Sequence, residues 1–231
     1  MKKYNHILFD LDHTLWDFEK NSAETLSQLY DAFHLSKYGK MNREDFISKF
    51  REVNAQLWSL YDQNRIGKEY LRDERFKLIF EGFGVKEDET AKRLGRDYLR
   101  ICPEKEHVMP HAYEVLEYLS GRYRLHIVTN GFRDVQSRKL AFSRLGNYFT
   151  RIITSEEAGF KKPDRGFFEY VLSKLEASNS ECVMVGDNIE TDIRGAFSVD
   201  MDIIFFNPGK LPHDEKVNFE ITSLLQMKDI L

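Results

Sequence analysis

A short apolar run that ends in two carboxylates constrains the fold of this chain more than any other feature. Residues 7–9 (IleLeuPhe) have the character of a buried parallel strand, and Asp10 and Asp12 follow at once. Buried carboxylates are costly unless they are paired or bound to a cation. Open α/β sheets bind their ligands beyond the carboxyl ends of the strands. If the strand alternation continues, Asp10 and Asp12 project from one side, as a nucleophile and an acid/base with a metal between them would.

Strand and helix patterns alternate from Pro110 to the end of the chain. Apolar runs typical of strands occupy residues 125–131, 151–155, 182–187 and 203–206, and helical patterns separate them. A polar element follows the last of these strands. Strands separated by helices imply parallel pairing, so we expect a doubly wound parallel α/β sheet.

The segment between the first strand and this alternating part is helical throughout. Four amphipathic patterns follow one another there, with Asn21 or Ser22 as the expected cap of the first helix and Asn42 as that of the second. Four such helices bury their apolar stripes against one another as a small bundle. We therefore predict an α/β core domain made of residues 1–16 and 104–231, with an inserted helical domain of residues 17–103.

Composition excludes several classes of function. The net charge of −4 gives no basic footprint, which disfavours binding of a nucleic-acid polymer. No apolar stretch approaches membrane-spanning length, and the N-terminal run is too short and too acidic for a signal peptide. Cys102 and Cys182 have neither metal-site spacing nor a disulfide pattern. These features lead us to expect a cytoplasmic protein without membrane partners.

Polar groups gather at the predicted strand ends, which a parallel sheet brings to one edge. These groups are Asp10, Asp12 and Thr14; Thr129, Asn130 and Gly131; Lys161 and Lys162; and Asp187 and Asp192. Two carboxylates about 4 Å apart repel by roughly 4 kcal/mol at an effective dielectric of 20. A divalent cation relieves this repulsion, and all-oxygen ligation favours Mg²⁺. A hydroxyl, turn amides and a lysine form an anion cradle suited to phosphate, next to an aspartate that can attack it.

Four segments in this order resemble the motifs of haloacid dehalogenase-type (HAD) phosphohydrolases. They are AspLeuAspHisThrLeu, ValThrAsnGly, LysLysProAsp and GlyAspAsnIleGluThrAsp. The resemblance covers nearly the whole chain, because the helical insert stands where such enzymes carry an α-helical cap. It implies a Rossmann-like core and a Mg²⁺-dependent hydrolase that acts through an aspartyl-phosphate.

The resemblance also implies roles for individual residues. Asp10 would be the nucleophile and Asp12 the general acid/base. The phosphate would be bound by Thr129, Asn130, Gly131 and Lys162, and the metal by Asp10, the backbone carbonyl of Asp12 and Asp187, with Asp192 in support. Lys162 is preferred to Lys161 because the family's lysine usually precedes the proline directly, and His13 stands where glycine is most common. Dehalogenases of the superfamily lack the second aspartate, so Asp12 favours phosphate chemistry.

The helical domain sets the substrate in this family. Leu57 and Trp58, then Ile66, Leu71, Arg75 and Phe76, resemble the pyrimidine 5′-nucleotidase branch. That likeness implies a small phosphorylated metabolite such as UMP, dUMP or dTMP. A sugar-phosphate or phosphoglycolate-type phosphatase and a phosphomutase remain alternatives. A non-enzymatic receiver-type signalling domain is a further one, which the long insertion after the first strand disfavours. The sequence leaves monomer and homodimer open.

Overall fold

The computed structural model describes residues 4–231, so residues 1–3 of the predicted core domain lie outside the described part. Its centre is a six-stranded parallel sheet in the order β3-β2-β1-β4-β5-β6. The strands are β1 (His6–Phe9), β2 (Arg124–Thr129), β3 (Arg151–Thr154), β4 (Cys182–Gly186), β5 (Asp202–Phe206) and β6 (Phe219–Ile221). The predicted doubly wound parallel sheet is confirmed, with β6 added at one edge.

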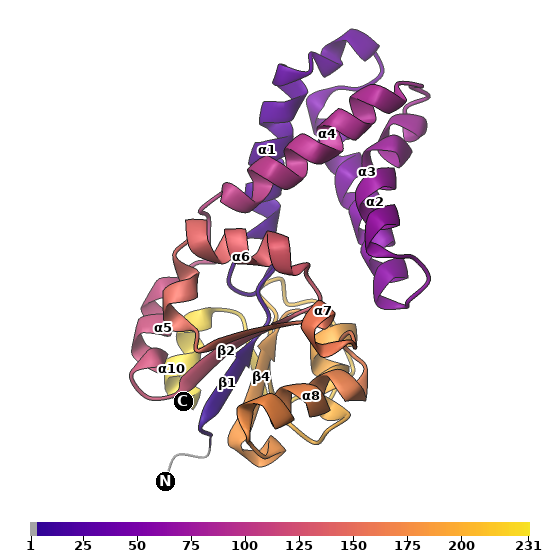
Figure 1. Cartoon of the computed structure of the whole chain (residues 1–231). Helices are drawn as coiled ribbons and strands as arrows, with labels where there is room; N and C mark the ends of the chain where they lie inside the picture. The colour runs from indigo at the N-terminus through magenta and orange to yellow at the C-terminus, as the bar shows by residue number, and fades with distance from the viewer. Residues whose placement is uncertain (1–3) are drawn as a thin grey trace. The chain divides into compact units, whose positions relative to one another are not determined.

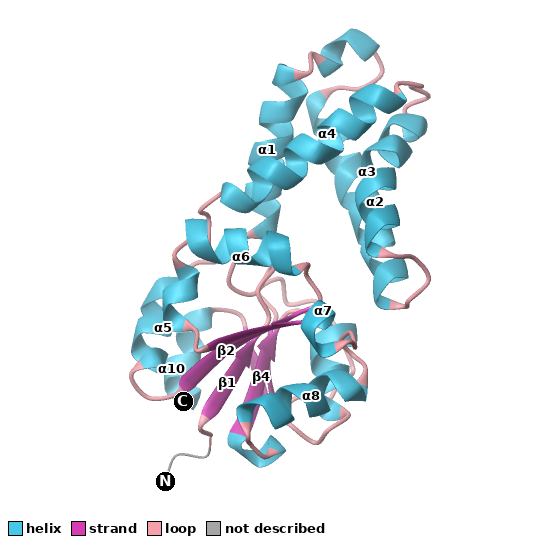
Figure 2. Cartoon of the chain, in the orientation of Figure 1, coloured by secondary structure: helices cyan, strands magenta, loops and turns pink. Residues whose placement is uncertain are grey.

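Helices cover both faces of the sheet (Figure 2). The helices α5 (Ala112–Ser120) and α10 (Met227–Ile230) lie on one face, and α8 (Arg165–Leu175) lies on the other. The remaining helices of this part are α6 (Arg133–Phe142), α7 (Ser155–Ala158) and α9 (Arg194–Phe197). Phe167 and Phe168 of α8 are fully buried in one apolar cluster with strand residues such as Met184. Burial of about 150–250 Å² by each aromatic side chain makes such contacts a large part of the core's stability.

The chain folds into two compact units, one made of residues 4–18 and 106–231 and the other of Glu19–Lys105. The second unit is helical (Figure 1). Its helices are α1 (Phe18–Ala32, which begins in the first unit), α2 (Arg43–Asp62), α3 (Lys68–Gly82) and α4 (Asp88–Ile101). Aromatic rings of three of these helices pack together, since Phe50 lies 5.7 Å from Phe76 and 4.8 Å from Tyr98 between ring centroids.

The predicted cap of the second helix is confirmed and that of the first is wrong. The Asn42 side chain accepts a hydrogen bond from the Asp45 N–H at 2.8 Å, at the start of α2. By contrast, α1 begins at Phe18, which places Asn21 and Ser22 inside the helix, where both are buried. Ser22 accepts a hydrogen bond from the Tyr98 hydroxyl at 3.0 Å, so its polar group serves packing within the bundle. In the part of the chain that the structure describes, no helix is both long and apolar enough to cross a membrane.

The sheet register brings the candidate residues together. Phe9, the last residue of β1, is paired with Ile127 of β2 and Val185 of β4. The Asp10 N–H continues the pairing by donating to the Val185 carbonyl at 2.9 Å. The strand order reverses between β1 and β4, because the chain proceeds to β2 and β3 on one side and to β4, β5 and β6 on the other. Such a switch point is where open α/β sheets bind ligands.

Candidate active site

Three carboxylates converge at the carboxyl ends of β1 and β4. Asp10, Asp187 and Asp192 each offer an oxygen, and these oxygens all lie within 4.8 Å of one another. Lys162 reaches into this group, because its ammonium donates to Asp10 Oδ1 and to Asp192 Oδ1, both at 2.6 Å. Its third hydrogen bond goes to the Val128 carbonyl at 3.0 Å. One buried cation therefore faces three carboxylates.

The pKa values in this cluster reflect that imbalance of charge. Burial raises the pKa of Asp10 well above its usual value, although Lys162 acts in the opposite direction. Burial and the neighbouring Asp192 carboxylate raise the pKa of Asp187 to about 6. Burial alone would lower the pKa of Lys162, yet the two carboxylates that it contacts raise it. A divalent cation would neutralise the uncompensated charge, and a donor set made only of oxygens fits Mg²⁺.

Local backbone structure brings Asp192 back to the end of β4. The Asn188 side chain accepts hydrogen bonds from the N–H groups of Glu190 and Thr191, which opens a single π-helical turn, Ile189–Ile193. That turn points the Asp192 carboxylate at Gly186, where the Cβ of any larger residue would lie 2.2 Å from Asp192 Oδ2. Glycine at this position is therefore a condition for the carboxylate cluster.

The end of β2 supplies a hydroxyl that is saturated as an acceptor. Thr129 Oγ1 accepts from the Gly131 N–H at 2.9 Å and from Gln136 Nε2 at 3.1 Å. A hydroxyl has two acceptor lone pairs and one donor, so only its proton is left to bind a ligand. No residue described in the structure accepts that proton. The Thr129 hydroxyl is accordingly available to an acceptor oxygen such as that of a phosphate.

Asn130 fixes the loop that carries the lysine. Its Nδ2 donates to the Lys162 carbonyl and its Oδ1 accepts from the Lys162 N–H, both at 2.8 Å. Because both ends of the amide are engaged in this way, the Asn130 side chain positions Lys162. The Gly131 N–H is likewise engaged with Thr129, so the four predicted phosphate-binding residues form two hydrogen-bonded pairs, Thr129 with Gly131 and Asn130 with Lys162.

The turn after β1 places Asp12 and Thr14 beside the carboxylates. The Thr14 hydroxyl donates to Asp187 Oδ1 at 3.0 Å. His13 has a φ of 65°, in the left-handed region that favours glycine. This backbone conformation explains why glycine is the most common residue at this position in the family that the motifs resemble. Burial alone would raise the pKa of the Asp12 carboxyl, but Lys139 and Gln136 hold it below its usual value.

Comparison with known proteins identifies the family. The model of the family described as haloacid dehalogenase-like hydrolase matches residues 4–200. The chain belongs to this family. It is 30% identical over 232 residues to the pyrimidine 5′-nucleotidase PynA of Streptococcus pneumoniae, an alignment that covers 99% of this chain and 95% of PynA. It is therefore a HAD-type phosphatase, as its motifs predict.

Two further relatives match nearly the whole chain. YfnB of Bacillus subtilis, named as a HAD-hydrolase, is 27% identical over 234 residues, which cover 100% of this chain and 97% of YfnB. A crystal structure of YfnB bound to magnesium gives a TM-score of 0.86 and covers 99% of both chains. A glyceraldehyde 3-phosphate phosphatase of Methanothermobacter thermautotrophicus is 28% identical over 238 residues, which cover 97% of this chain and 98% of that protein.

Sequence reasoning missed the two residues of this HAD phosphatase that contact the Asp12 side chain. Lys139 and Gln136 lie three residues apart on α6, and both are buried. The signal was their helical spacing, which puts two polar side chains on the buried face of the helix that follows β2. In isolation such a pair reads as part of a solvated helix surface.

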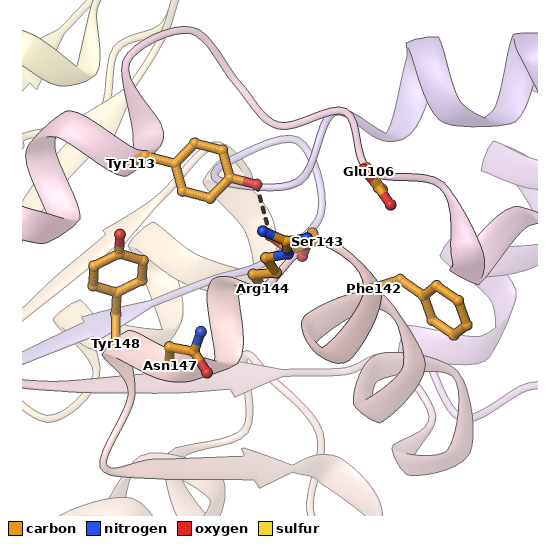
Figure 3. A pocket seen from close by; sticks show the side chains of 7 residues that line it. All are labelled: Glu106, Tyr113, Phe142, Ser143, Arg144, Asn147 and Tyr148. Atoms are coloured by element: carbon orange, nitrogen blue, oxygen red, sulfur yellow. Dashed lines mark hydrogen bonds between the residues drawn. The ribbon is translucent and has the colours of Figure 1, made fainter.

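A separate pocket lies elsewhere on the α/β unit (Figure 3). Its volume is about 430 Å³. It is lined by Glu106, Tyr113, Phe142, Ser143, Arg144, Asn147 and Tyr148, and the Tyr113 hydroxyl donates to the Ser143 carbonyl across it at 2.6 Å. None of the four motifs contributes a residue to its lining, so this pocket is distinct from the carboxylate cluster.

Proposed function

We propose that this HAD-type phosphatase is a Mg²⁺-dependent phosphomonoesterase that acts through an aspartyl-phosphate on Asp10 and hydrolyses pyrimidine nucleoside 5′-monophosphates. The observation that carries the proposal is the group formed by buried Asp10 and Asp192 and half-buried Asp187 around the buried Lys162. It joins a nucleophile, an excess of negative charge and a cation at one switch point. The neighbouring Thr129 hydroxyl adds a donor for the phosphoryl oxygens.

The metal would be held by Asp10, Asp187 and the backbone carbonyl of Asp12, with Asp192 beside them. When bound, the divalent cation supplies positive charge next to the phosphoryl oxygens and lowers the repulsion between them and the attacking carboxylate. The raised pKa values of Asp10 and Asp187 are consistent with this assignment, because burial first and neighbouring carboxylates second raise them, and a bound cation would oppose both effects.

The chain's own residues perform two transfers. In the first, Asp12 takes up a proton from solvent when the anionic phosphate ester binds, an Asp10 oxygen forms a bond to phosphorus, and the bond from phosphorus to the ester oxygen breaks. Asp12 passes its proton to that leaving oxygen. In the second, the oxygen of a water molecule bonds to phosphorus, its proton passes to Asp12, and the bond between phosphorus and Asp10 breaks. Inorganic phosphate leaves, Asp12 returns the proton to solvent, and both carboxylates are regenerated. Thr129 and Lys162 hold the phosphoryl group throughout.

The helical unit is proposed to be the cap that selects the substrate. Support for pyrimidine nucleotides comes from the relative PynA and from the likeness of Leu57, Trp58 and Arg75–Phe76 to that branch. The relative that acts on glyceraldehyde 3-phosphate makes a sugar-phosphate phosphatase the second candidate. A phosphomutase would move the phosphoryl group instead of releasing it, so the reaction products distinguish it from both.

The test is phosphate release from a panel of pyrimidine and purine monophosphates, sugar phosphates and phosphoglycolate, with Mg²⁺ and with a chelator. We expect turnover that the chelator abolishes and that is fastest with UMP, dUMP or dTMP. Asp10→Asn should remove all turnover, whereas Asp229→Asn, a matched loss of one exposed carboxylate on α10, should retain it. Full turnover by Asp10→Asn would refute the mechanism. Equal rates across the panel would refute only the pyrimidine assignment.

A further inference from the structure

Two residues of α6 hold the side chain of Asp12, one at each carboxylate oxygen. Lys139 Nζ donates to Asp12 Oδ1 at 2.5 Å, and Gln136 Nε2 donates to Asp12 Oδ2 at 2.9 Å. Donors at both oxygens fix the rotation of the carboxylate as well as its position. Each oxygen keeps further lone pairs, because an ionised carboxylate has about four acceptor sites.

Lys139 is itself held in place by its surroundings. The residue is 5% exposed, and its ammonium lies over the Trp16 ring at 4.5 Å from the centroid and near the Phe18 ring at 5.7 Å. Among residues 4–231, Lys139 forms its ion pair with Asp12. A buried ammonium is costly unless it is paired, so the ion pair with Asp12 and the aromatic rings together stabilise Lys139 in this position.

Gln136 connects Asp12 to the phosphate-binding end of β2. The residue is 1% exposed, and its Nε2 also donates to Thr129 Oγ1 at 3.1 Å. The fit leaves no room for a side chain at position 131, since a Cβ built on Gly131 would lie 1.6 Å from Gln136 Nε2. The motif glycine thus admits the glutamine amide, which lies between the acid/base and the hydroxyl proposed to bind phosphate.

We propose that Lys139 and Gln136 are positioning residues that hold Asp12 for proton transfer to the leaving oxygen of the substrate. The proposal rests on the function proposed above. Proton transfer requires the donor and acceptor atoms to lie about 2.6–3.2 Å apart, and Asp12 sits on a turn after β1 where nothing else that the structure describes orients its side chain. Both residues contact the Asp12 carboxylate and are proposed to contact neither the phosphoryl group nor the leaving oxygen, so both act through Asp12.

The leaving group of the substrate separates this role from a merely structural one. An alkyl leaving oxygen needs the proton of Asp12, whereas the p-nitrophenolate ion is stable enough to leave without it. The value of kcat/KM reports the first transfer, in which the leaving oxygen departs. Loss of Asp12 positioning should therefore reduce kcat/KM for alkyl esters much more than for p-nitrophenyl phosphate.

The experiment measures kcat and KM of the whole protein with Mg²⁺ on the best nucleoside or sugar monophosphate and on p-nitrophenyl phosphate. We expect Lys139→Met and Gln136→Leu to lower kcat/KM for the alkyl ester by about 100-fold and for the aryl ester by less than about 10-fold, mainly through kcat. Lys139→Arg, which keeps a cation beside Asp12, should recover most of the loss. Arg138→Met removes a charge from the adjacent position of α6 and should leave the ratio of the two substrates unchanged.

A double-mutant cycle distinguishes an effect of Lys139 on Asp12 from general damage to the fold of the variant. If Lys139 acts through Asp12, the Lys139→Met effect disappears in an Asp12→Asn background, measured on the aryl ester. An equal loss on both esters, or an undiminished Lys139→Met effect in that background, would overturn the positioning role. Absence of phosphate release by the wild-type protein from every ester would instead refute the proposed function.

Discussion

Replacement of Gly186 by alanine tests how closely the backbone of β4 and the carboxylate cluster depend on one another. A Cβ at this position would lie 2.2 Å from Asp192 Oδ2, 2.5 Å from its Cγ and 2.7 Å from its Cβ. Asp192 is 1% exposed and is held by Lys162 Nζ at 2.6 Å and by the Asn188 N–H at 3.2 Å. The added methyl group cannot be accommodated unless the carboxylate gives up at least one of these contacts.

The size of the effect follows from those contacts. Overpacking of a tight interior costs about 1–3 kcal/mol, and a hydrogen bond to a charged group contributes about 1.5–3 kcal/mol. Displacement of Asp192 relieves the overpacking but loses a hydrogen bond to a charged group. Because one of these two costs remains in either case, we expect Gly186→Ala to lower the free energy of unfolding by about 3 kcal/mol. For a chain of this size that corresponds to a fall in melting temperature of roughly 6–12 °C.

The assay is thermal unfolding followed by circular dichroism, in chelator and again in Mg²⁺. Gly121→Ala is the matched control, because Gly121 has a φ of −74° and a Cβ there meets no atom within 4 Å. That variant should melt at the wild-type temperature or slightly above it. Addition of Mg²⁺ should stabilise the wild type and Gly121→Ala, and should stabilise Gly186→Ala much less. A wild-type melting temperature for Gly186→Ala would refute the packing explanation, and an undiminished Mg²⁺ shift would refute the place of Asp192 beside the metal.

Two predictions concern buried basic side chains outside the site. Burial and the neighbouring His6, whose Nδ1 lies 3.0 Å from His126 Nε2, lower the pKa of His126 to about 4. An unfolded histidine has a pKa near 6.5, so the folded protein should lose about 2 kcal/mol of stability, after allowance for screening, as the pH falls from about 6.5 to 4. The measurement is the urea midpoint across this pH range, which should fall less for His126→Phe than for the wild type. In the helical unit, Arg75 lies buried over the rings of Phe50 and Tyr98, and among residues 4–231 its Nε has no hydrogen-bond partner. Arg75→Met should therefore raise the free energy of unfolding by about 1 kcal/mol, and a loss of stability in urea would contradict this.

The fold was predictable where local patterns and tertiary structure agree. The runs that became β1 to β5 are apolar and short, and helical patterns separate them, so parallel pairing followed without knowledge of the partners. The edge strand β6 was not predicted, because Phe219–Ile221 is short and two of its three residues are exposed. Its strand character comes from pairing with β5, which no local pattern reports. The start of α1 was misplaced for a similar reason, since Asn21 and Ser22 are typical caps that the bundle buries.

The candidate site was predictable to the extent that its members stand at strand ends. Asp10, Asp187 and Asp192 were placed together from the sequence, and the structure brings their oxygens within 4.8 Å. The support for Asp12 was not foreseen, because Lys139 and Gln136 become neighbours of Asp12 only through the packing of α6. Polar residues inside a helix are usually solvated, and only tertiary contacts distinguish the exceptions.

Lys162 links the binding of metal and of phosphate in the proposed mechanism. An ammonium group has three N–H donors, and in this structure they are directed at Asp10, Asp192 and the Val128 carbonyl. A phosphoryl oxygen can bind to Lys162 only if one of these acceptors is released. Release of a carboxylate is costly while it remains an unpaired buried charge, and a divalent cation among the carboxylates removes that cost. In that mechanism metal and phosphate would favour each other's binding, and the coupling would be reciprocal because it is a difference in binding free energy.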